Sequence, residues 1–271
     1  MAQAQRKKAD RKQIYQYPVD IVLGQGGTGT VYRAQDPETK ELLAIKVFRA
    51  NFFRNSMHER SLAKMAKKAY KLNHPNVVHV KEFIRGKEGN CLVMEYVDGQ
   101  DLKWYMENRP VHLEGRLVIV AQICNGLGYL HENGMVHHDL KPANVLFTRR
   151  GQVKLADFSL FGGGSLRGFF DPGYSEQITP MFVSPELIEK KKATHLADMY
   201  SLGVMLYMLF TEKVPFQVDT LAQLYHAHLT VAPIHPSVHN PKVPQALGDV
   251  IMRLLSKKPE LRPQSAQQLR I

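Results

Sequence analysis

The sequence predicts an α+β fold in which a small, strand-rich part is followed by a larger, mainly helical part. Between Tyr15 and Val97, short runs of β-branched and aromatic residues are separated by turn-forming residues, which is typical of strands. After Gly99, apolar residues recur three or four positions apart, as in the run from Leu113 to Leu130, and this spacing predicts helices. A chain of 271 residues without internal repeats fits one large domain or two small lobes.

The elements are expected in a simple order along the chain. Residues 1–14, rich in Lys and Arg, are expected to be a solvated basic leader, residues 15–97 the strand-rich lobe and residues 98–271 the helical lobe. Strands are expected at 19–23, 30–34, 42–48, 77–83 and 91–97, with one polar and basic helix at 56–72. Further helices are expected at 113–130, 195–211, 219–229, 245–256 and 264–271, of which 195–211 is apolar enough to be fully buried.

Composition limits the classes of protein to consider. Hydrophobic residues make up 44% and charged residues 23%, which argues against disorder and against a fibre. Lys and Arg number 36 against 25 Asp and Glu, so the net charge of +11 favours anionic partners: nucleic acid, acidic lipid or polyphosphate nucleotides. The sign of the charge alone does not choose among them.

Cysteine usage and hydropathy bear on the compartment. Cys91 and Cys124 make no disulfide framework, so a reducing cytoplasm is expected. The longest apolar run, from Met199 to Phe210, is too short for a membrane span. No apolar stretch follows the basic residues 6–12, so a secretory signal is not expected.

The segment GQGGTGTV, from Gly24 to Val31, places three glycines between two predicted strands. Glycine lets a backbone approach phosphate oxygens closely, although for this segment taken alone a glycine-rich hairpin turn is the favoured explanation. Just downstream, the strand LLAIKVF places Ala44, Lys46 and Phe48 on one face. A lysine within an apolar strand is costly unless it is paired, so Lys46 is predicted to bind phosphate, the alternative being an edge lysine whose ammonium reaches water.

The densest chemistry lies in HHDLKPANVL, from His137 to Leu146, and in VKLADFS, from Val153 to Ser159. Together they supply Asp139, Asn144 and Asp157. Carboxylate and amide oxygens can hold Mg²⁺, while a remaining carboxylate orients a hydroxyl group. In isolation these residues could equally stabilise turns, but two such groups, each beside a predicted strand, make that reading poor.

These segments, in this order, resemble the eukaryotic-type (Hanks-type) serine/threonine protein kinase domain, in its bacterial branch. The glycine loop, AIK, HPN (His74 to Asn76), HxDLKPxN, DFx and TPxFxSPE (Thr179 to Glu186) all occur at the family's spacing. The resemblance covers the chain from about Tyr15 to its end. It implies the bilobal kinase fold, with a small antiparallel sheet and one main helix in the first lobe, a helical second lobe, and an activation segment at 157–186.

The resemblance also implies where nucleotide binds. Gly24, Gly26 and Gly29 are expected to cover the phosphates of ATP, and Lys46 to bind its α- and β-phosphates. The adenine pocket is expected to be formed by Leu23, Val31, Ala44 and Leu146, with Met94 as gatekeeper and the hinge from Glu95 to Val97.

The same resemblance assigns the catalytic groups. Asp139 is expected to accept or orient the proton of the substrate hydroxyl, and Lys141 to neutralise the γ-phosphate and to mark specificity for Ser/Thr over Tyr. Asn144 and Asp157 are expected to hold Mg²⁺, with Mn²⁺ as an alternative ion. Structural roles are expected for a Glu186–Arg262 pair, for Asp198 as an anchor of the catalytic loop, and for Thr179 as a hydroxyl near the catalytic aspartate.

The most serious departure from the family pattern concerns the helix at 56–72. The family's helix glutamate, which pairs with the strand lysine, falls on Met65, and the nearest upstream acid, Glu59, lies on another side of that helix. Catalysis that depends on positioning Lys46 would suffer. In the plainer interpretation, Met65 simply packs the helix.

Two further departures lie near the catalytic groups. His138 replaces the family's arginine, the usual anchor for an activation-loop phosphate, so any activity is expected without loop phosphorylation; control by acidity is an alternative. Ser159 replaces the glycine of DFG, and the glycine-rich loop 160–177 is expected to be a flexible surface segment.

The sequence therefore predicts an ATP- and Mg²⁺-dependent Ser/Thr protein kinase acting on a protein hydroxyl. The alternative is a pseudokinase, a nucleotide-binding scaffold with weak or no transfer because of Met65; phosphorylation of a small molecule is less favoured because TPxFxSPE resembles a platform for peptides. Zinc at the histidine pairs 226/228 and 235/239 is not expected, because no supporting ligand is spaced for it. Nucleic acid is not expected at Lys190 to Lys192, because no recognised binding fold accompanies them, and the oligomeric state is not indicated.

Overall fold

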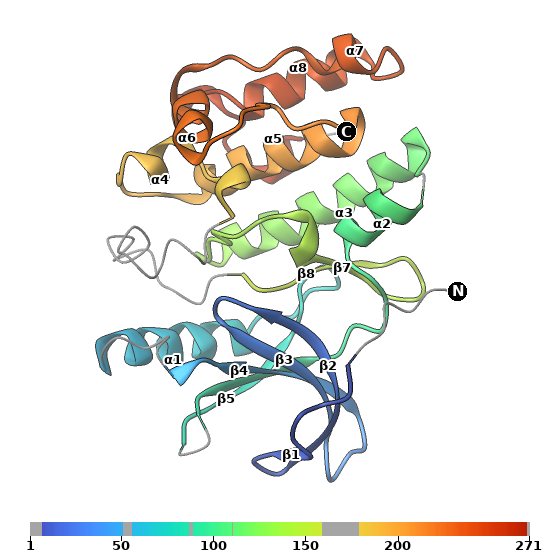
Figure 1. Cartoon of the computed structure of the whole chain (residues 1–271), viewed down its shortest axis with the longest axis vertical. Coiled ribbons are helices and arrows are strands. Elements are labelled where there is room, and N and C mark those ends of the chain that lie inside the picture. Colours follow the sequence, from blue (N-terminus) through green and yellow to red (C-terminus); the bar gives the residue numbers. More distant parts are fainter. Residues whose placement is uncertain (1–6, 51–55, 87–88, 110, 159–178, 270–271) are drawn as a thin grey trace. The chain divides into compact units, whose positions relative to one another are not determined.

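The computed structural model describes residues 7–50, 56–86, 89–109, 111–158 and 179–269. They form two compact units, shown in Figure 1. The first contains the described residues up to His74 together with Val78–Asp98, and the second contains Pro75–Val77 and the described residues from Gly99 to Phe158 and from Thr179 onwards. Each unit has its own sheet, and the mixture of strands and helices confirms the predicted α+β class.

A six-stranded antiparallel sheet forms the centre of the first unit. Its strand order is β1-β2-β3-β4-β6-β5 (Figure 1). The strands are β1 (Gln13–Ile14), β2 (Tyr17–Gly26), β3 (Gly29–Gln35), β4 (Leu42–Phe48), β5 (Val80–Ile84) and β6 (Cys91–Glu95). β4 matches its predicted range of 42–48 residue for residue, because the apolar run ends at polar residues on both sides.

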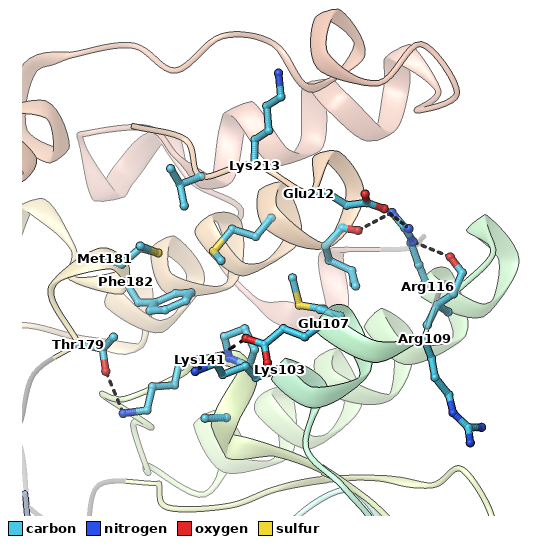
Figure 2. A pocket seen from close by; sticks show the side chains of 17 residues that line it. Lys103, Glu107, Arg109, Arg116, Lys141, Thr179, Met181, Phe182, Glu212 and Lys213 are labelled. Atoms are coloured by element: carbon cyan, nitrogen blue, oxygen red, sulfur yellow. Dashed lines mark hydrogen bonds and ion pairs between the residues drawn. The ribbon is translucent and has the colours of Figure 1, made fainter. Parts of the chain in front are cut away.

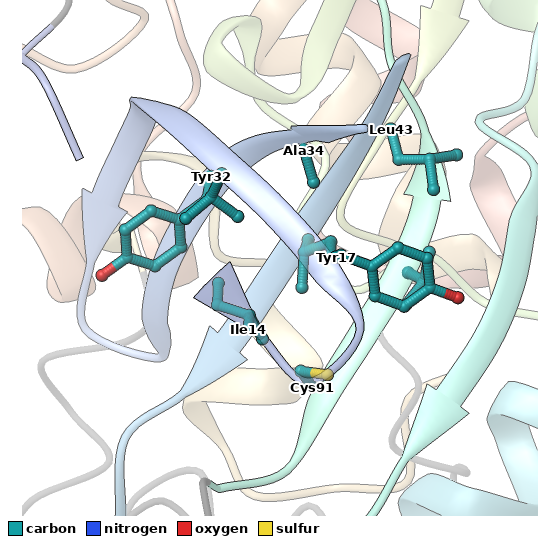
Figure 3. Packing of buried hydrophobic residues seen from close by; sticks show 9 residues of the cluster. Ile14, Tyr17, Tyr32, Ala34, Leu43 and Cys91 are labelled. Atoms are coloured by element: carbon teal, nitrogen blue, oxygen red, sulfur yellow. The ribbon is translucent and has the colours of Figure 1, made fainter. Parts of the chain in front are cut away.

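One face of this sheet packs into a compact apolar cluster, which Figure 3 shows. The alternation of strands brings every second residue to the same face, so Leu43 and Ile45 of β4 join it while Ala44 and Lys46 do not. The buried members of the cluster are Ile14, Tyr17, Val19, Tyr32, Ala34, Leu43, Ile45, Cys91 and Val93.

Residues 7–14 differ from the solvated leader that the sequence predicts. The backbone N–H of Ala9 donates to the Asp20 oxygen, and that of Val22 donates to the Lys7 oxygen, both at 2.9 Å. Ile14 is 1% exposed and lies in the apolar cluster. The correction is that the basic side chains project from a segment paired with β2, because backbone hydrogen bonding to an edge strand depends little on side-chain charge.

The long helix α1 (Ser56–Tyr70) of the first unit packs against β5. Its buried residues recur three and four positions apart, as an amphipathic helix requires. They are Leu62, Met65, Ala66 and Ala69. Lys64, Lys67 and Lys68 are exposed.

Helices dominate the second unit. They are α2 (Leu102–Asn108), α3 (Leu113–Glu132), α4 (Pro185–Ile188), α5 (His195–Thr211), α6 (Leu221–Thr230), α7 (Pro236–His239) and α8 (Gln245–Leu254). α5 has the predicted bounds and is almost wholly buried, with α3, α7 and α8 packed against it. It begins at the cap Thr194, whose side chain accepts a hydrogen bond from the backbone N–H of Leu196.

A short hairpin of the second unit follows the segment from His137 to Asn144. β7 (Val145–Phe147) pairs with β8 (Val153–Leu155) directly after the 3₁₀ turn η2 (Pro142–Asn144). Asn76 of the HPN motif also belongs to this unit. Its side chain donates to the backbone oxygen of Val153 at 2.8 Å, and its backbone oxygen accepts from the N–H of Leu155. The remaining 3₁₀ turns are η4 (Pro180–Phe182), η5 (Pro259–Leu261) and η6 (Ala266–Gln268).

The helix predicted at 264–271 is wrong over its described part. Only η6 is present there, with Ala266 fully buried and the Gln267 side chain donating to Glu132 of α3 at 2.7 Å. These contacts with α3 override the helical pattern of a short segment.

Among the described residues, no helix combines the length and apolar character that crossing a bilayer requires. Cys91 and Cys124 are both buried free thiols.

Candidate active site

The glycine segment forms the hairpin between β2 and β3. Gly26 pairs with Gly29 across the turn, and Gly24 pairs with Val31. At Gly29 a Cβ would overlap the carbonyl oxygen of Val47, so this glycine is required by the close approach of β4. Gly24 and Gly26 face open space and are exposed, so packing does not require glycine at either position. Packing therefore explains the glycine at position 29 and does not explain those at 24 and 26.

The predicted nucleotide contacts of the first unit share the face of the sheet opposite the apolar cluster. Val31 pairs with Lys46 across β3 and β4, and Ala44 pairs with Met94 across β4 and β6. Because their strand neighbours Tyr32, Ile45 and Val93 lie in the cluster, these four residues point the other way. Leu23 lies at an irregularity of β2, between Val22, which packs against the cluster, and Gly24, which pairs with Val31. The structure thus brings Val31, Ala44, Lys46 and Met94 together from three different strands of the sheet.

Lys46 is partly buried in the middle of this face. Its Nζ lies 5.9 Å from the centroid of the Phe48 ring, two residues along the same strand. At the end of β6, Glu95 Oε1 accepts a hydrogen bond of 2.7 Å from the backbone N–H of His79, which secures the start of the predicted hinge. Val97 follows, partly exposed, while Leu146 belongs to β7 of the second unit.

In the second unit, the predicted catalytic segment, from His137 to Leu146, contains a hydrogen-bonded group of polar side chains. Asp139 Oδ2 lies 2.7 Å from Lys141 Nζ, which also donates to Thr179 Oγ1 at 2.9 Å. Asn144 Nδ2 donates to the backbone oxygen of Asp139 at 2.8 Å and to its Oδ2 at 2.9 Å. Lys141 and Asn144 therefore both bind the Asp139 carboxylate. Thr179, expected near this aspartate, is linked to it through Lys141.

The donors on Asn144 fix the orientation of its amide. Both Nδ2 bonds run to Asp139, so the amide oxygen is the atom that can bind a cation. The Asn144 backbone oxygen accepts from the N–H of Ala156 at 2.9 Å, which places Asp157 one residue from this contact. Asp157 has a φ of 53°, a left-handed conformation that Asp tolerates better than most residues. An amide and a carboxylate oxygen suit Mg²⁺, so these two side chains fit the predicted metal site.

The predicted anchoring role of Asp198 is confirmed. Its carboxylate accepts the backbone N–H groups of His137 and His138, each at 2.7 Å, from the first turn of the buried helix α5. Burial would raise the pKa of Asp198, but the hydrogen bond from His131 and the nearby histidines outweigh it and leave that pKa lowered. His131 was not among the predicted site residues, yet its Nε2 lies 2.8 Å from Asp198 Oδ2. No local motif marks this residue, since it is simply the penultimate residue of α3.

His138 occupies the position of the family's arginine without replacing its charge. Burial lowers the pKa of His138, so the ring is neutral at neutral pH. Its backbone has a φ of 63°. A neutral ring attracts a phosphate weakly, which supports the expectation of activity without loop phosphorylation and not the alternative of control by acidity near pH 7. Ser159 and residues 160–177 of the predicted activation segment lie outside the described residues.

The predicted pair of Glu186 and Arg262 is also confirmed. Arg262 Nη1 and Nη2 donate to the two carboxylate oxygens at 2.8 and 2.9 Å, a bidentate arrangement. Both side chains are buried, and Arg262 also donates to the backbone oxygens of Leu196, Ser256 and Lys257. This pair joins the end of the TPxFxSPE segment to the C-terminal part of the unit.

The histidine pairs have ordinary local partners. His228 Nδ1 lies 2.8 Å from the Tyr200 hydroxyl, and His235 lies beside Asp249 and Ser237. Within the part of the chain that the structure describes, no three side chains of His, Cys, Asp or Glu gather as a metal site would require.

Comparison with protein families decides the classification of this chain. The model of the protein kinase domain family matches residues 17–270. The chain belongs to the protein kinase domain family. This confirms the kinase domain that the sequence predicts. Its similarity to bacterial serine/threonine-protein kinases supports the predicted bacterial Ser/Thr type.

Three bacterial proteins illustrate this similarity. The chain is 34% identical over 94% of its length to a probable serine/threonine-protein kinase of Streptomyces coelicolor, 36% identical over 93% to the serine/threonine-protein kinase PkaA of the same organism, and 31% identical over 93% to the serine/threonine-protein kinase PrkC of Bacillus subtilis. It spans 39%, 48% and 39% of those proteins, that is, less than half of each.

Solved structures agree with the family and the fold. The kinase domain of Mycobacterium tuberculosis PknI, in a doubly substituted form, superimposes with a TM-score of 0.77 at 26% identity, covering 96% of both chains. The PknI kinase domain without these substitutions gives 0.76 with the same coverage. The predicted kinase fold, with an antiparallel sheet in the first lobe and a helical second lobe, is confirmed. The family as a whole uses ATP and a divalent metal and acts on proteins.

Proposed function

We propose that this domain is an ATP-dependent protein Ser/Thr kinase that transfers the γ-phosphate to a hydroxyl group of a protein substrate. The observation that supports this most strongly is the hydrogen-bonded group of Asp139, Lys141 and Asn144, with Thr179 at its edge. A scaffold without catalysis has no need for a carboxylate held in place by both an ammonium and an amide. The family match supports the same conclusion.

Asp139 is the group that handles the proton. In the proposed reaction the substrate oxygen bonds to the γ-phosphorus, the bond from that phosphorus to the β–γ bridging oxygen breaks, and ADP leaves. The hydroxyl proton passes to the Asp139 carboxylate or is oriented by it. Lys141, at 2.7 Å from Asp139 Oδ2, places a positive charge where the transferred phosphoryl group carries negative charge.

Asn144 and Asp157 are proposed to hold Mg²⁺, with Mn²⁺ as an alternative. When bound, such an ion supplies positive charge to the phosphates. The chain's own contribution is to fix the donors: the Asn144 amide is oriented by its two bonds to Asp139, and Asp157 lies two residues after the end of β8. On the first unit, Lys46 and the exposed backbone of Gly24 and Gly26 are proposed to bind the phosphates of ATP.

The second candidate function is a pseudokinase, and Met65 favours it. Met65 is 9% exposed, on the buried face of α1 with Leu62, Ala66 and Ala69, where the family has a glutamate for the strand lysine. This position therefore contributes packing and no carboxylate. Slow or absent transfer with intact nucleotide binding is the behaviour that this candidate predicts.

Radiolabelled ATP separates the two candidates. The protein is incubated with labelled ATP, Mg²⁺ or Mn²⁺ and a generic basic protein acceptor, beside an Asp139→Asn variant. The substitution keeps the size of the side chain and an oxygen that can accept the Asn144 hydrogen bond, so it removes the charge with little other change. Transfer by the wild type that the substitution abolishes supports the kinase; transfer that persists in the variant contradicts it.

Thermal unfolding with nucleotide provides the second measurement. Ligands that bind the folded state raise the unfolding temperature, so ATP with Mg²⁺ is expected to stabilise the wild type. Stabilisation without any transfer selects the pseudokinase. If ATP gives no stabilisation and there is no transfer, both candidates are contradicted. Because ATP and reduced thiols are abundant in the cytoplasm, and both cysteines are free, we propose that compartment for the domain.

A further inference from the structure

The second unit contains a pocket of about 520 Å³, shown in Figure 2. It is bordered by α2 and the start of α3, by the catalytic segment around η2, by η4, and by the C-terminal end of α5. All of these elements belong to one unit. A volume of this size accommodates a side chain together with part of the backbone that carries it.

The pocket is continuous with the proposed catalytic group. Lys141 and Thr179 line it, and their side chains are hydrogen-bonded to each other at 2.9 Å (Figure 2). Lys141 Nζ is also 2.7 Å from the Asp139 carboxylate. Whatever enters the pocket therefore lies beside the place where the substrate hydroxyl reacts. The molecule that carries that hydroxyl is the natural occupant.

Methionine side chains from three different elements line the pocket. Met106 comes from α2, Met181 from η4 and Met208 from α5, and each is only partly buried. Phe182 and Leu209 are buried behind them. Methionine is unbranched, flexible and polarisable, so surfaces rich in it accept apolar groups of different shape.

Four of the charged residues that line the pocket form two ion pairs, while Arg109 lies over the Trp104 ring and Lys213 lies beside His239. Lys103 and Glu107 are 3.9 Å apart, and Arg116 donates to Glu212 Oε1 at 2.9 Å. Arg116 also donates to the backbone oxygens of Val111 and Leu209, so it braces the start of α3 against the end of α5 (Figure 2). Most of these charged side chains are exposed to solvent, where an ionic contact contributes little free energy. Contact with the apolar lining is therefore the stronger source of selectivity in this pocket.

We propose that this pocket binds a large apolar side chain of the protein substrate, close in sequence to the phosphorylated Ser or Thr, and that Met106, Met181 and Met208 determine this specificity. The inference rests on the proposed function, since it assumes that the substrate is a protein. The flexible methionines accept Leu, Met and Phe to a similar degree. Small and charged residues are rejected, because they leave the pocket unfilled or place a charge against apolar walls.

A set of short peptides tests the preference. Each carries one Ser in a polar background, with Leu placed in turn at each neighbouring position on both sides, and the best position is then changed to Met, Phe, Ala or Asp. The expected result is one position at which kcat/KM for Leu, Met and Phe is similar and about tenfold to a hundredfold higher than for Ala or Asp. Equal values for Leu, Ala and Asp at every position overturn the inference.

Matched variants assign the preference to the pocket. Met106→Gln introduces a polar group of the same length on α2, and Met252→Gln makes the same change on α8 at a partly exposed methionine that does not line the pocket. The first variant is expected to raise KM for the Leu peptide and to bring the ratio of Leu to Ala values towards one. The second is expected to leave that ratio unchanged. A preference that survives Met106→Gln, Met181→Gln and Met208→Gln contradicts the assignment.

Binding of the same peptides, followed by fluorescence anisotropy, separates this inference from the proposed function. Transfer to basic acceptors without any apolar preference overturns the inference and leaves the kinase in place. If no acceptor is phosphorylated, the kinase is overturned and peptide binding alone tests the pocket. Tighter binding of the Leu peptide than of the Asp peptide, with the difference lost in Met106→Gln, supports the inference. Equal binding of the two peptides overturns it.

Discussion

The carboxylate of Asp198 accepts a hydrogen bond of 2.7 Å from the backbone N–H of His138. It accepts a second from the N–H of His137 and a third from the His131 ring, so one fully buried side chain in the first turn of α5 fixes the backbone that leads into Asp139. Buried charges are retained in proteins only when they are well paired. The predicted catalytic loop is therefore anchored by a side chain of the core.

Replacing Asp198 with Asn is expected to lower both stability and activity. An amide offers one acceptor oxygen to three donors and points an NH₂ group at some of them, so the free energy of unfolding is expected to fall by about 3 kcal/mol. Urea unfolding measures the loss, and phosphotransfer measured well below the new midpoint is expected to fall as well. Unchanged stability would show that the loop is held elsewhere.

Thr179→Val tests the hydrogen bond between Thr179 and Lys141. The valine keeps the shape of the side chain but removes the acceptor of the 2.9 Å bond, leaving Lys141 with Asp139 alone. Because a hydrogen bond to a charged group contributes about 1–2 kcal/mol or more, kcat is expected to fall about tenfold. Thr179→Ser keeps the hydroxyl and is expected to retain most of the rate. Equal rates for the two variants refute a role for the hydroxyl.

Met65→Ala tests whether this position of α1 is a packing residue. Removing a nearly buried methionine side chain is expected to cost about 2 kcal/mol, while Met65→Leu costs much less because it preserves volume. Lys68→Ala, on the exposed side of the same helix, is the control and is expected to change stability by less than about 0.5 kcal/mol. Chemical denaturation reports all three. If Met65→Glu were instead tolerated and accelerated phosphotransfer, the position would belong to the catalytic machinery.

Because of His228, the free energy of unfolding is expected to fall as the pH is lowered from about 7.5 to about 5.5. Burial, reinforced by the charge of Lys257, lowers the pKa of His228 from 6.5 to about 4, so the unfolded chain takes up a proton in this range that the folded state does not. Stability carried by His228 is therefore present above pH 6.5 and is lost below it, by about 1 kcal/mol at about pH 5.5.

Denaturant unfolding at the two pH values measures this loss in matched variants. His228→Gln is expected to show a smaller decrease than the wild type, whereas His226→Gln, two residues earlier on α6 and exposed, is expected to show the same decrease. The remaining decrease is assigned to His137 and His138, whose pKa values are lowered by burial in the same direction. An identical pH dependence in both variants contradicts the assignment to His228.

Phosphotransfer is expected to be independent of phosphorylation between residues 159 and 178. The neutral His138 ring cannot supply the charge with which an arginine binds a phosphate, so treatment with a phosphatase is expected to leave the initial rate within about twofold. Ser165→Ala and Ser175→Ala are expected to behave like the untreated protein. A large loss confined to Ser175→Ala rejects this expectation.

The sequence by itself determined the family and most of the elements. The order of the glycine hairpin, Lys46, Asp139 and Asn144, and Asp157 predicted a kinase domain. The apolar runs 42–48 and 195–211 predicted the bounds of β4 and α5, because a largely buried strand or helix is apolar along most of its length. The pairing of Glu186 with Arg262 and the anchoring by Asp198 followed from the resemblance.

Only the tertiary structure decided which residues far apart in the chain touch. It brought His131 of α3 to Asp198 of α5, paired residues 7–14 with β2 against the expectation of a solvated leader, and reduced the helix expected at 264–271 to a 3₁₀ turn against α3. It also assembled a methionine-lined pocket from three elements whose sequences share no motif. Such contacts depend on which distant segments pack together, and the apolar pattern of one segment does not identify its partner.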